Sequence, residues 1–174
     1  AFNMNDISAI KKKVYALIEK VLSYKTDMII AISAWEKESA AKYKICCSDK
    51  IHIIPSGVDV CLYDEKQGRY DLNRSKLNIP VDAYVIGMVG RISYGKGPDL
   101  FVKAAALIKN KIPNAFFVIV GEGEERSSIE NLLSEMGLKE DFLITGWVSN
   151  PMEYIQLFDQ AMLLTRWEGF GLVL

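Results

Sequence analysis

The chain has 174 residues, of which 50% are hydrophobic and 25% charged, and its formal net charge is −1. A chain of this length can bury a sizeable core, and the composition is that of a globular protein rather than a disordered one. The near-neutral charge argues against a nucleic-acid partner. No run approaches the roughly 18 apolar residues that a membrane span needs.

The three cysteines, Cys46, Cys47 and Cys61, show no metal-ligand spacing. Their odd number also fits poorly with a disulfide framework. The amino-terminal residues lack the basic lead and the apolar stretch of a signal peptide. We therefore expect a cytoplasmic protein without a metal site.

The first sixty residues combine helical and strand patterns. Three-four spacing of apolar residues predicts an amphipathic helix with Asp6 as its N-cap, and the apolar run over 28–32 predicts a strand covered on both faces. The polar face of that helix carries three consecutive lysines, which indicates a solvated surface or, alternatively, attraction to an anionic membrane. The expected elements are a helix over 6–24, a strand over 28–32, a helix over 33–43 capped by Ser33, and a strand over 51–54.

After Pro80 strands and helices alternate regularly. We expect strands over 84–89, 115–120, 141–145 and 161–165, and helices over 98–109, 124–136 and 151–158. This alternation predicts an α/β fold, a Rossmann-like parallel sheet with helices on both faces. Ligands of such sheets bind at the carboxyl ends of the strands, where the glycine-rich turns of this segment fall.

The turn that begins at Gly90 carries two cations between a strand and a helix. Its spacing nearly matches a P-loop, but Gly97 stands where a P-loop needs a serine or threonine hydroxyl for magnesium. The N–H groups and the dipole of the following helix favour an anion there. Arg91 offers a two-pronged donor and Lys96 a compact charge, so the pair can replace a metal ion on a diphosphate. The alternative is two surface cations in a loop.

Gly121 and Gly123 follow the next strand and resemble the start of a dinucleotide-binding fingerprint. Arg126 occupies the place of the third glycine, so a nicotinamide cofactor is not expected. The two glycines indicate close approach of the backbone to a ligand or to a neighbouring helix. Trp147, at the end of a further strand, can cover a base ring or pack against the adjacent helix.

Glu168 follows the last predicted strand and precedes Gly169 and Gly171. A carboxylate at this place can meet sugar hydroxyls, while the N–H groups that follow can meet phosphate. Combined with Arg91 and Lys96, it predicts a site for a nucleotide diphosphate and its attached sugar.

Taken in order, these segments resemble the retaining glycosyltransferases of family 4, which have the two-Rossmann-domain GT-B fold. The resemblance covers roughly residues 26–174 and is carried by 32–33, 54–59, 89–91, 96–97, 118–123, 145–147 and 168–174. It implies that 1–60 end an amino-terminal acceptor domain and that 61–80 connect the domains. Residues 81–174 would form the nucleotide-sugar-binding domain, incomplete at its carboxyl end.

The resemblance implies transfer of a sugar, with retention, from a nucleotide-diphosphate donor to a hydroxyl of a carbohydrate or lipid-linked acceptor, without cofactor or required metal. It places the reaction in polysaccharide or glycoconjugate biosynthesis, in the cytoplasm or peripheral to a membrane. Arg91, Lys96 and Glu168 would be the catalytic residues. The implied donor-binding residues are Gly90, Gly121, Gly123, Trp147, Val148, Phe170, Gly171, Leu172 and Val173.

The family places a second glutamate eight residues after Glu168, which is two positions beyond Leu174. We therefore expect a fragment of a larger enzyme that binds donor weakly or not at all and is inactive alone. Two other classes fit the same architecture. A sugar-nucleotide 2-epimerase would convert the donor without an acceptor, and a non-catalytic module would bind a nucleotide sugar or a partner without turnover.

Overall fold

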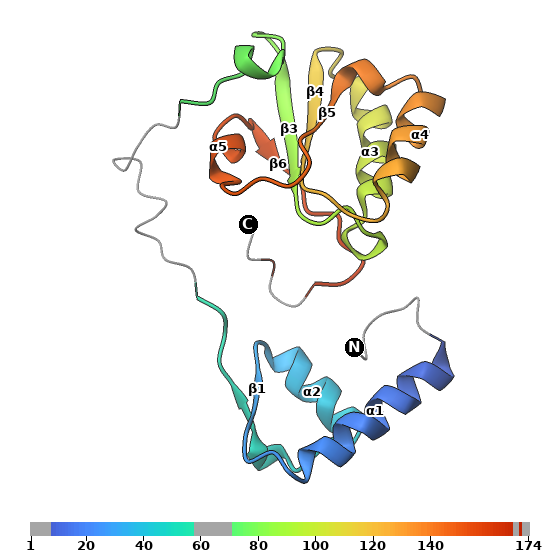
Figure 1. Ribbon diagram of the computed structural model, residues 1–174, viewed down its shortest axis with the longest axis vertical. Helices are drawn as coiled ribbons and strands as arrows, with labels where there is room; N and C mark the ends of the chain where they lie inside the picture. The colour runs from blue at the N-terminus through green and yellow to red at the C-terminus, as the bar shows by residue number, and fades with distance from the viewer. Residues whose placement is uncertain (1–7, 58–70, 169–170, 172–174) are drawn as a thin grey trace. The chain divides into compact units, whose positions relative to one another are not determined.

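The computed structural model describes residues 8–57, 71–168 and 171 of the chain. Two compact units divide these residues (Figure 1). The first comprises residues 8–57 with Trp167, Glu168 and Gly171, and the second comprises residues 71–166. Each unit has its own parallel sheet.

The first unit contains α1 (Ala9–Ser23), β1 (Ile29–Ala31), α2 (Ala34–Lys42) and β2 (Ile51–Ile53), with β1 and β2 paired in parallel. Helix α2 begins as predicted after Ser33, whose hydroxyl accepts the N–H of Glu36 at 3.2 Å. Helix α1 begins after Ser8, whose hydroxyl accepts the N–H of Lys11 at 3.4 Å. The predicted cap Asp6 lies outside the described residues.

The prediction that both faces of β1 are covered is wrong for this unit. Ala31 is buried, whereas Ile30, on the opposite face of the strand, is 58% exposed. Helix α2 packs against both strands of the sheet. Within residues 8–57, the apolar run over 28–32 therefore contains a strand that is buried on one face of the sheet.

The second unit is built on a four-stranded parallel sheet in the order β5-β4-β3-β6. Its strands are β3 (Tyr84–Val89), β4 (Ala115–Val120), β5 (Phe142–Ile144) and β6 (Gln160–Ala161). β3 and β4 pair along their whole lengths, and Val89 lies opposite Val120 at their carboxyl ends. The turns that follow the two strands therefore lie side by side. The predicted strands over 84–89 and 115–120 are confirmed.

The predicted strand over 161–165 is wrong, because β6 ends at Ala161. Met162 and Leu164 instead pack against the core on the α3 side of the sheet, which accounts for the apolar character of the segment. The backbone N–H of Arg166 donates to the carbonyl of Gly95 at 2.9 Å. The chain thus leaves β3 and turns toward the loop that precedes α3.

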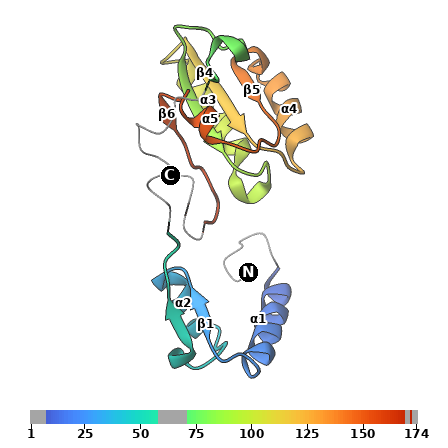
Figure 2. The same cartoon turned by 60° about the vertical axis from the view of Figure 1, so that its left-hand side comes forward.

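Helices cover both faces of the sheet, as predicted: α3 (Pro98–Lys109) and α4 (Arg126–Glu135) on one face, and α5 (Met152–Ile155) on the other (Figures 1 and 2). Side chains of β4 alternate between two cores. Phe117 packs with Phe101 of α3, whereas Val118 packs in the core that includes Tyr154 of α5. Short 3-10 turns are η1 (Ser48–Lys50), η3 (Ser75–Leu77), η4 (Tyr94–Lys96) and η5 (Lys139–Asp141).

Gly87, in the middle of β3, provides a test of this packing, because a Cβ at this position would overlap the ring of Phe158. We expect Gly87→Ala to lower the free energy of unfolding by about 1–3 kcal/mol, since the ring must leave a packed layer. Gly57→Ala adds its methyl group to open space and serves as control, with an expected change within about 0.5 kcal/mol. Urea unfolding followed by circular dichroism measures both. Equal losses in the two variants would contradict the packing.

Candidate functional site

The turn after β3 joins the sheet to α3. It begins at Gly90, whose N–H donates to the carbonyl of Val120 at 3.0 Å, and it closes with η4 and Gly97. Gly97 has a φ of 67°, and a Cβ there would also overlap the carbonyl oxygen of Leu164. Glycine is therefore required at position 97 by both its dihedral angle and its neighbour. This explains why the P-loop hydroxyl is replaced at this position.

The turn after β4 lies directly against the turn after β3. A side chain at Gly121, which has a φ of 151°, would overlap the carbonyl oxygen of Gly90, and one at Gly123 would overlap that of Ile92. Ile92 is fully buried, and its N–H donates to the carbonyl of Glu122 at 3.0 Å. The two glycines thus bring two backbones together. This is the close approach expected from the sequence, with a neighbouring turn as the partner.

The turn after β5 completes a cavity at the carboxyl ends of the strands. Gly146 forms a bridge with Gly121, and the next residue, Trp147, is 78% exposed. The cavity has a volume of about 440 Å³. Its lining residues are Val89, Gly90, Arg91, Val120, Gly121, Glu122, Gly123, Trp147, Val148 and Pro151. The structure therefore brings together six of the positions singled out from the sequence.

The two predicted cations both lie near Gly90. Arg91 lines the cavity and is largely exposed. The side-chain stem of Lys96 passes Gly90, since a Cβ placed on that glycine would lie 3.9 Å from the Lys96 Cδ. Both cations therefore belong to one short segment of chain at the cavity.

Acidic side chains that were not predicted as part of the site pair with Arg91 and with Arg126. Arg91 Nε donates to the carboxylate of Glu124 at 3.0 Å. Arg126, at the start of α4, donates to Glu122 at 2.6 Å and to Glu130 at 2.8 Å. The hydrogen bond from Arg126, assisted by the N–H of Gly123, lowers the pKa of Glu122. The rim of the cavity thus contains paired charges of both signs.

A second group of contacts that was not predicted from the sequence surrounds Arg166. Its guanidinium donates to both carboxylate oxygens of Asp99, at 2.8 and 2.7 Å, and to the carbonyl of Tyr94 at 2.7 Å. It also lies 4.0 Å from the centre of the Tyr94 ring. Asp99 is in the first turn of α3, 67 residues from its partner. No spacing pattern in the sequence signals such a pair.

Glu168 is exposed and groups with the first unit, so its relation to the cavity stays a prediction. Gly171 has a φ of 69°. Phe170, Leu172 and Val173 lie outside the described residues. Among the residues that are described, no three His, Cys, Asp or Glu side chains gather where a metal ion could bind, and no helix has the length and apolar character to cross a membrane.

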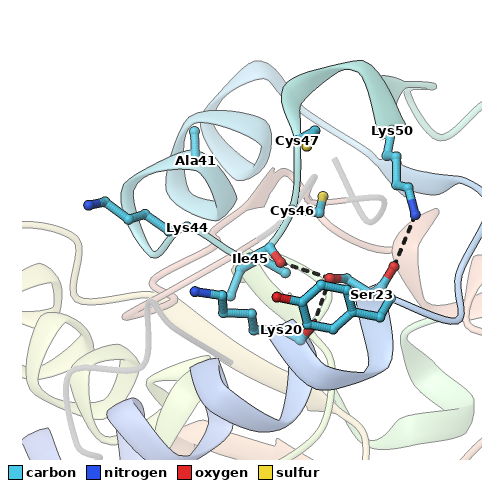
Figure 3. Close-up of a pocket in the computed structure, with 9 residues that line it drawn as sticks. Lys20, Ser23, Ala41, Lys44, Ile45, Cys46, Cys47 and Lys50 are labelled. Atoms are coloured by element: carbon cyan, nitrogen blue, oxygen red, sulfur yellow. Dashed lines mark hydrogen bonds between the residues drawn. The ribbon is translucent and has the colours of Figure 1, made fainter.

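The first unit contains a separate cavity of about 380 Å³ between the end of α1 and the segment after α2 (Figure 3). The Ser23 hydroxyl lies 2.7 Å from the carbonyl oxygen of Lys20 and 2.8 Å from that of Ile45. Lys50 Nζ donates to the carbonyls of Ser23 and Thr26 at 3.2 and 2.8 Å. These bonds fasten α1 to the following segment. None of the residues predicted to bind donor lines this cavity.

Solved structures that superimpose on this chain include GT-B glycosyltransferases. HepE of Anabaena, in complex with UDP and glucose, superimposes with a TM-score of 0.81 over 92% of this chain and 44% of its own, at 18% sequence identity. The pneumococcal O-GlcNAc transferase GtfA, in complex with UDP and GlcNAc, gives a TM-score of 0.72 over 92% of this chain and 30% of its own, at 21% identity. The fold is therefore the Rossmann-like α/β fold of GT-B glycosyltransferases, as predicted.

The sequence assigns the family. Residues 70–174 match the family "Glycosyl transferases group 1", and the chain belongs to this family. The Escherichia coli UDP-Gal:alpha-D-GlcNAc-diphosphoundecaprenol alpha-1,3-galactosyltransferase is 32% identical over 166 residues, which are 94% of this chain and 43% of the relative. The chain thus spans less than half the length of this relative.

The Asp99–Arg166 pair predicts a pH-dependent contribution to stability. The hydrogen bond from Arg166 lowers the pKa of Asp99 below its usual 3.8, with a smaller contribution from Lys103. Stabilisation from a carboxylate of lowered pKa is complete above the unfolded pKa and is lost as the pH falls through the folded pKa. Asp99→Asn should therefore lower the free energy of unfolding by about 1–2 kcal/mol near pH 7 and by progressively less below about pH 3.8. Urea unfolding of both proteins at several pH values measures this. A difference independent of pH would contradict the ionic contribution.

Proposed function

We propose that this chain forms the donor site of a glycosyltransferase that moves a sugar from a nucleoside diphosphate to an acceptor hydroxyl in glycoconjugate biosynthesis. The observation that carries the proposal is the cavity at the carboxyl ends of β3, β4 and β5, which joins a glycine-lined backbone surface to Arg91 and an exposed Trp147. Membership of the group 1 family supports it.

In this proposal Arg91 and Lys96 hold the diphosphate. Arg91 is exposed and bonded to Glu124, so donor binding exchanges a carboxylate partner for a phosphate partner. Gly90 directly precedes Arg91 and lies beside the stem of Lys96, and it has no side chain to block approach. When the bond from the anomeric carbon to the diphosphate oxygen breaks, negative charge grows on that oxygen, and cations fixed beforehand stabilise it. This role requires no metal ion.

The base would lie on Trp147 and Val148. Trp147 presents its ring to solvent at the rim of the cavity, and Val148 is half-buried beside it. The E. coli relative is named for a UDP-sugar donor, and both solved neighbours contain UDP. We therefore propose UDP as the nucleotide. The name of the E. coli relative includes a diphosphoundecaprenol acceptor, so we also propose a lipid-linked acceptor and action at a membrane surface.

Glu168 would contact the donor sugar, and the backbone of the segment that contains Phe170, Gly171, Leu172 and Val173 would contact phosphate or sugar. The bond from the anomeric carbon to the diphosphate would break, the acceptor oxygen would bond that carbon on the same face, and the acceptor proton would pass to the departing diphosphate oxygen, which gives retention. The chain spans 43% of its E. coli relative. We propose that turnover also requires regions outside these 174 residues, so that the isolated chain binds donor without transferring sugar.

Loss of either cation tests the diphosphate site. We expect Arg91→Ala and Lys96→Ala each to weaken UDP binding about 10- to 100-fold, because a hydrogen bond to a charged group contributes about 1.5–3 kcal/mol. Calorimetric titration with UDP, GDP and ADP measures the affinities and identifies the base. Lys111→Ala, at the opposite end of α3, removes the same charge and should leave binding within about twofold.

Three outcomes separate the proposal from its alternatives. Equal losses in all three variants would indicate an effect of net charge and contradict the site. Release of UDP that requires an acceptor identifies a transferase, whereas conversion of the donor sugar without acceptor identifies an epimerase. Binding without either reaction in the full-length protein identifies a non-catalytic module.

Trp147 provides an independent test of the base position. A ring stacked on a base typically contributes about 1–3 kcal/mol. Trp147→Ala should therefore weaken UDP binding about 5- to 100-fold, whereas Trp147→Phe should retain most of the affinity. Because Trp147 is exposed, its removal should leave the thermal unfolding midpoint nearly unchanged. Methylenediphosphonate has no base. If Trp147→Ala weakens its binding as much as it weakens UDP binding, the ring does not contact the base.

A further inference from the structure

The segment after β6 is attached to the cation-bearing turn mainly through one residue, Arg166. Its backbone N–H bonds the carbonyl of Gly95 at 2.9 Å, and its guanidinium bonds the carbonyl of Tyr94 at 2.7 Å. These two carbonyls belong to the two residues directly before Lys96. Arg166 thus fixes the backbone from which the Lys96 side chain departs.

The same guanidinium also fixes the start of α3. It donates hydrogen bonds to both carboxylate oxygens of Asp99, and it lies over the ring of Tyr94. The side chains of Arg166 and Asp99 are 19% and 28% exposed, so solvent screens this pair less than it screens the more exposed Arg91–Glu124 pair. A planar guanidinium can satisfy a carboxylate, a carbonyl and a ring face at once, whereas an ammonium group cannot reproduce this geometry.

We infer that Arg166 is a positioning residue for donor binding, which acts by holding the Tyr94–Lys96 turn so that Lys96 is preset beside Gly90. This inference rests on the proposed function of the cavity. Arg166 itself does not line the cavity, so its effect on donor must pass through the turn. In the sequence it stands two residues before Glu168.

A double-mutant cycle tests the route of this effect. UDP affinity is measured calorimetrically on the full-length protein for Arg166→Lys, Lys96→Ala and the two combined. We expect Arg166→Lys alone to weaken UDP binding about tenfold, because a lysine keeps the charge but cannot donate both hydrogen bonds to the Asp99 carboxylate in the same geometry. In the Lys96→Ala background the same change should have an effect of less than about threefold, since the side chain being positioned is gone.

A matched control separates positioning from general stability. Lys109→Met removes an equally buried ion pair, with Asp141 at 2.7 Å, at the opposite end of α3. We expect it to reduce stability but to leave UDP affinity within about twofold. Urea unfolding of each variant confirms that binding is measured on folded protein.

The outcomes distinguish the positioning role from the proposed function. If wild-type protein does not bind UDP, or binds it equally well without Arg91 and Lys96, the proposed function fails and the inference with it. If UDP binding depends on Lys96 but Arg166→Lys has the same effect with and without Lys96, the positioning role alone is overturned. The positioning role is likewise overturned if Lys109→Met weakens UDP binding as much as Arg166→Lys does.

Discussion

The site depends on one constraint, the direct contact of two backbones at the ends of β3 and β4. The carbonyl groups of Gly90 and Ile92 occupy the space in which side chains at positions 121 and 123 would lie. Backbone hydrogen bonds join the two turns. β3 and β4 end at paired residues, so the turns begin at the same height along the sheet. The cavity, the exposed ring of Trp147 and the two cations are all placed relative to this contact. A side chain at either glycine would separate the turns rather than merely crowd a ligand.

Charge at the cavity is arranged as exchangeable pairs. Arg91 has a carboxylate partner, and Arg126 holds Glu122 and Glu130. Exposed pairs of this kind contribute little to stability, so exchanging one carboxylate for a phosphate is not opposed by a large loss of folding free energy. A doubly charged diphosphate competes well against a single carboxylate for the same guanidinium. The half-buried Asp99–Arg166 pair differs from these, because it is less exposed and its guanidinium bonds both carboxylate oxygens.

Much of this site could be predicted from the sequence, because the alternation of strands and helices places each glycine-rich turn at the carboxyl end of a strand. That logic located Gly90, Arg91, Gly121, Gly123, Trp147 and Val148, which now line one cavity. It could not locate the Asp99–Arg166 pair, because a contact between residues 67 positions apart leaves no periodic signal. It also misassigned the run over 161–165 as a strand, since Met162 and Leu164 are apolar for packing against the α3 core and not for pairing with β3.

The shortness of β6 has a mechanical consequence. β3 shares six paired positions with β4 but only two with β6, so the far edge of the sheet is joined by few backbone hydrogen bonds. Segments held by few such bonds open locally at a lower free energy than the core of a sheet. The stretch from Ala161 to Arg166 is therefore joined to β3 by a short ladder at one end and to the turn before α3 by the backbone and guanidinium of Arg166 at the other, with Met162 and Leu164 packed against the core between them. Loss of the Arg166 contacts would loosen the carboxyl-terminal end of this stretch without unfolding the sheet that carries the cavity.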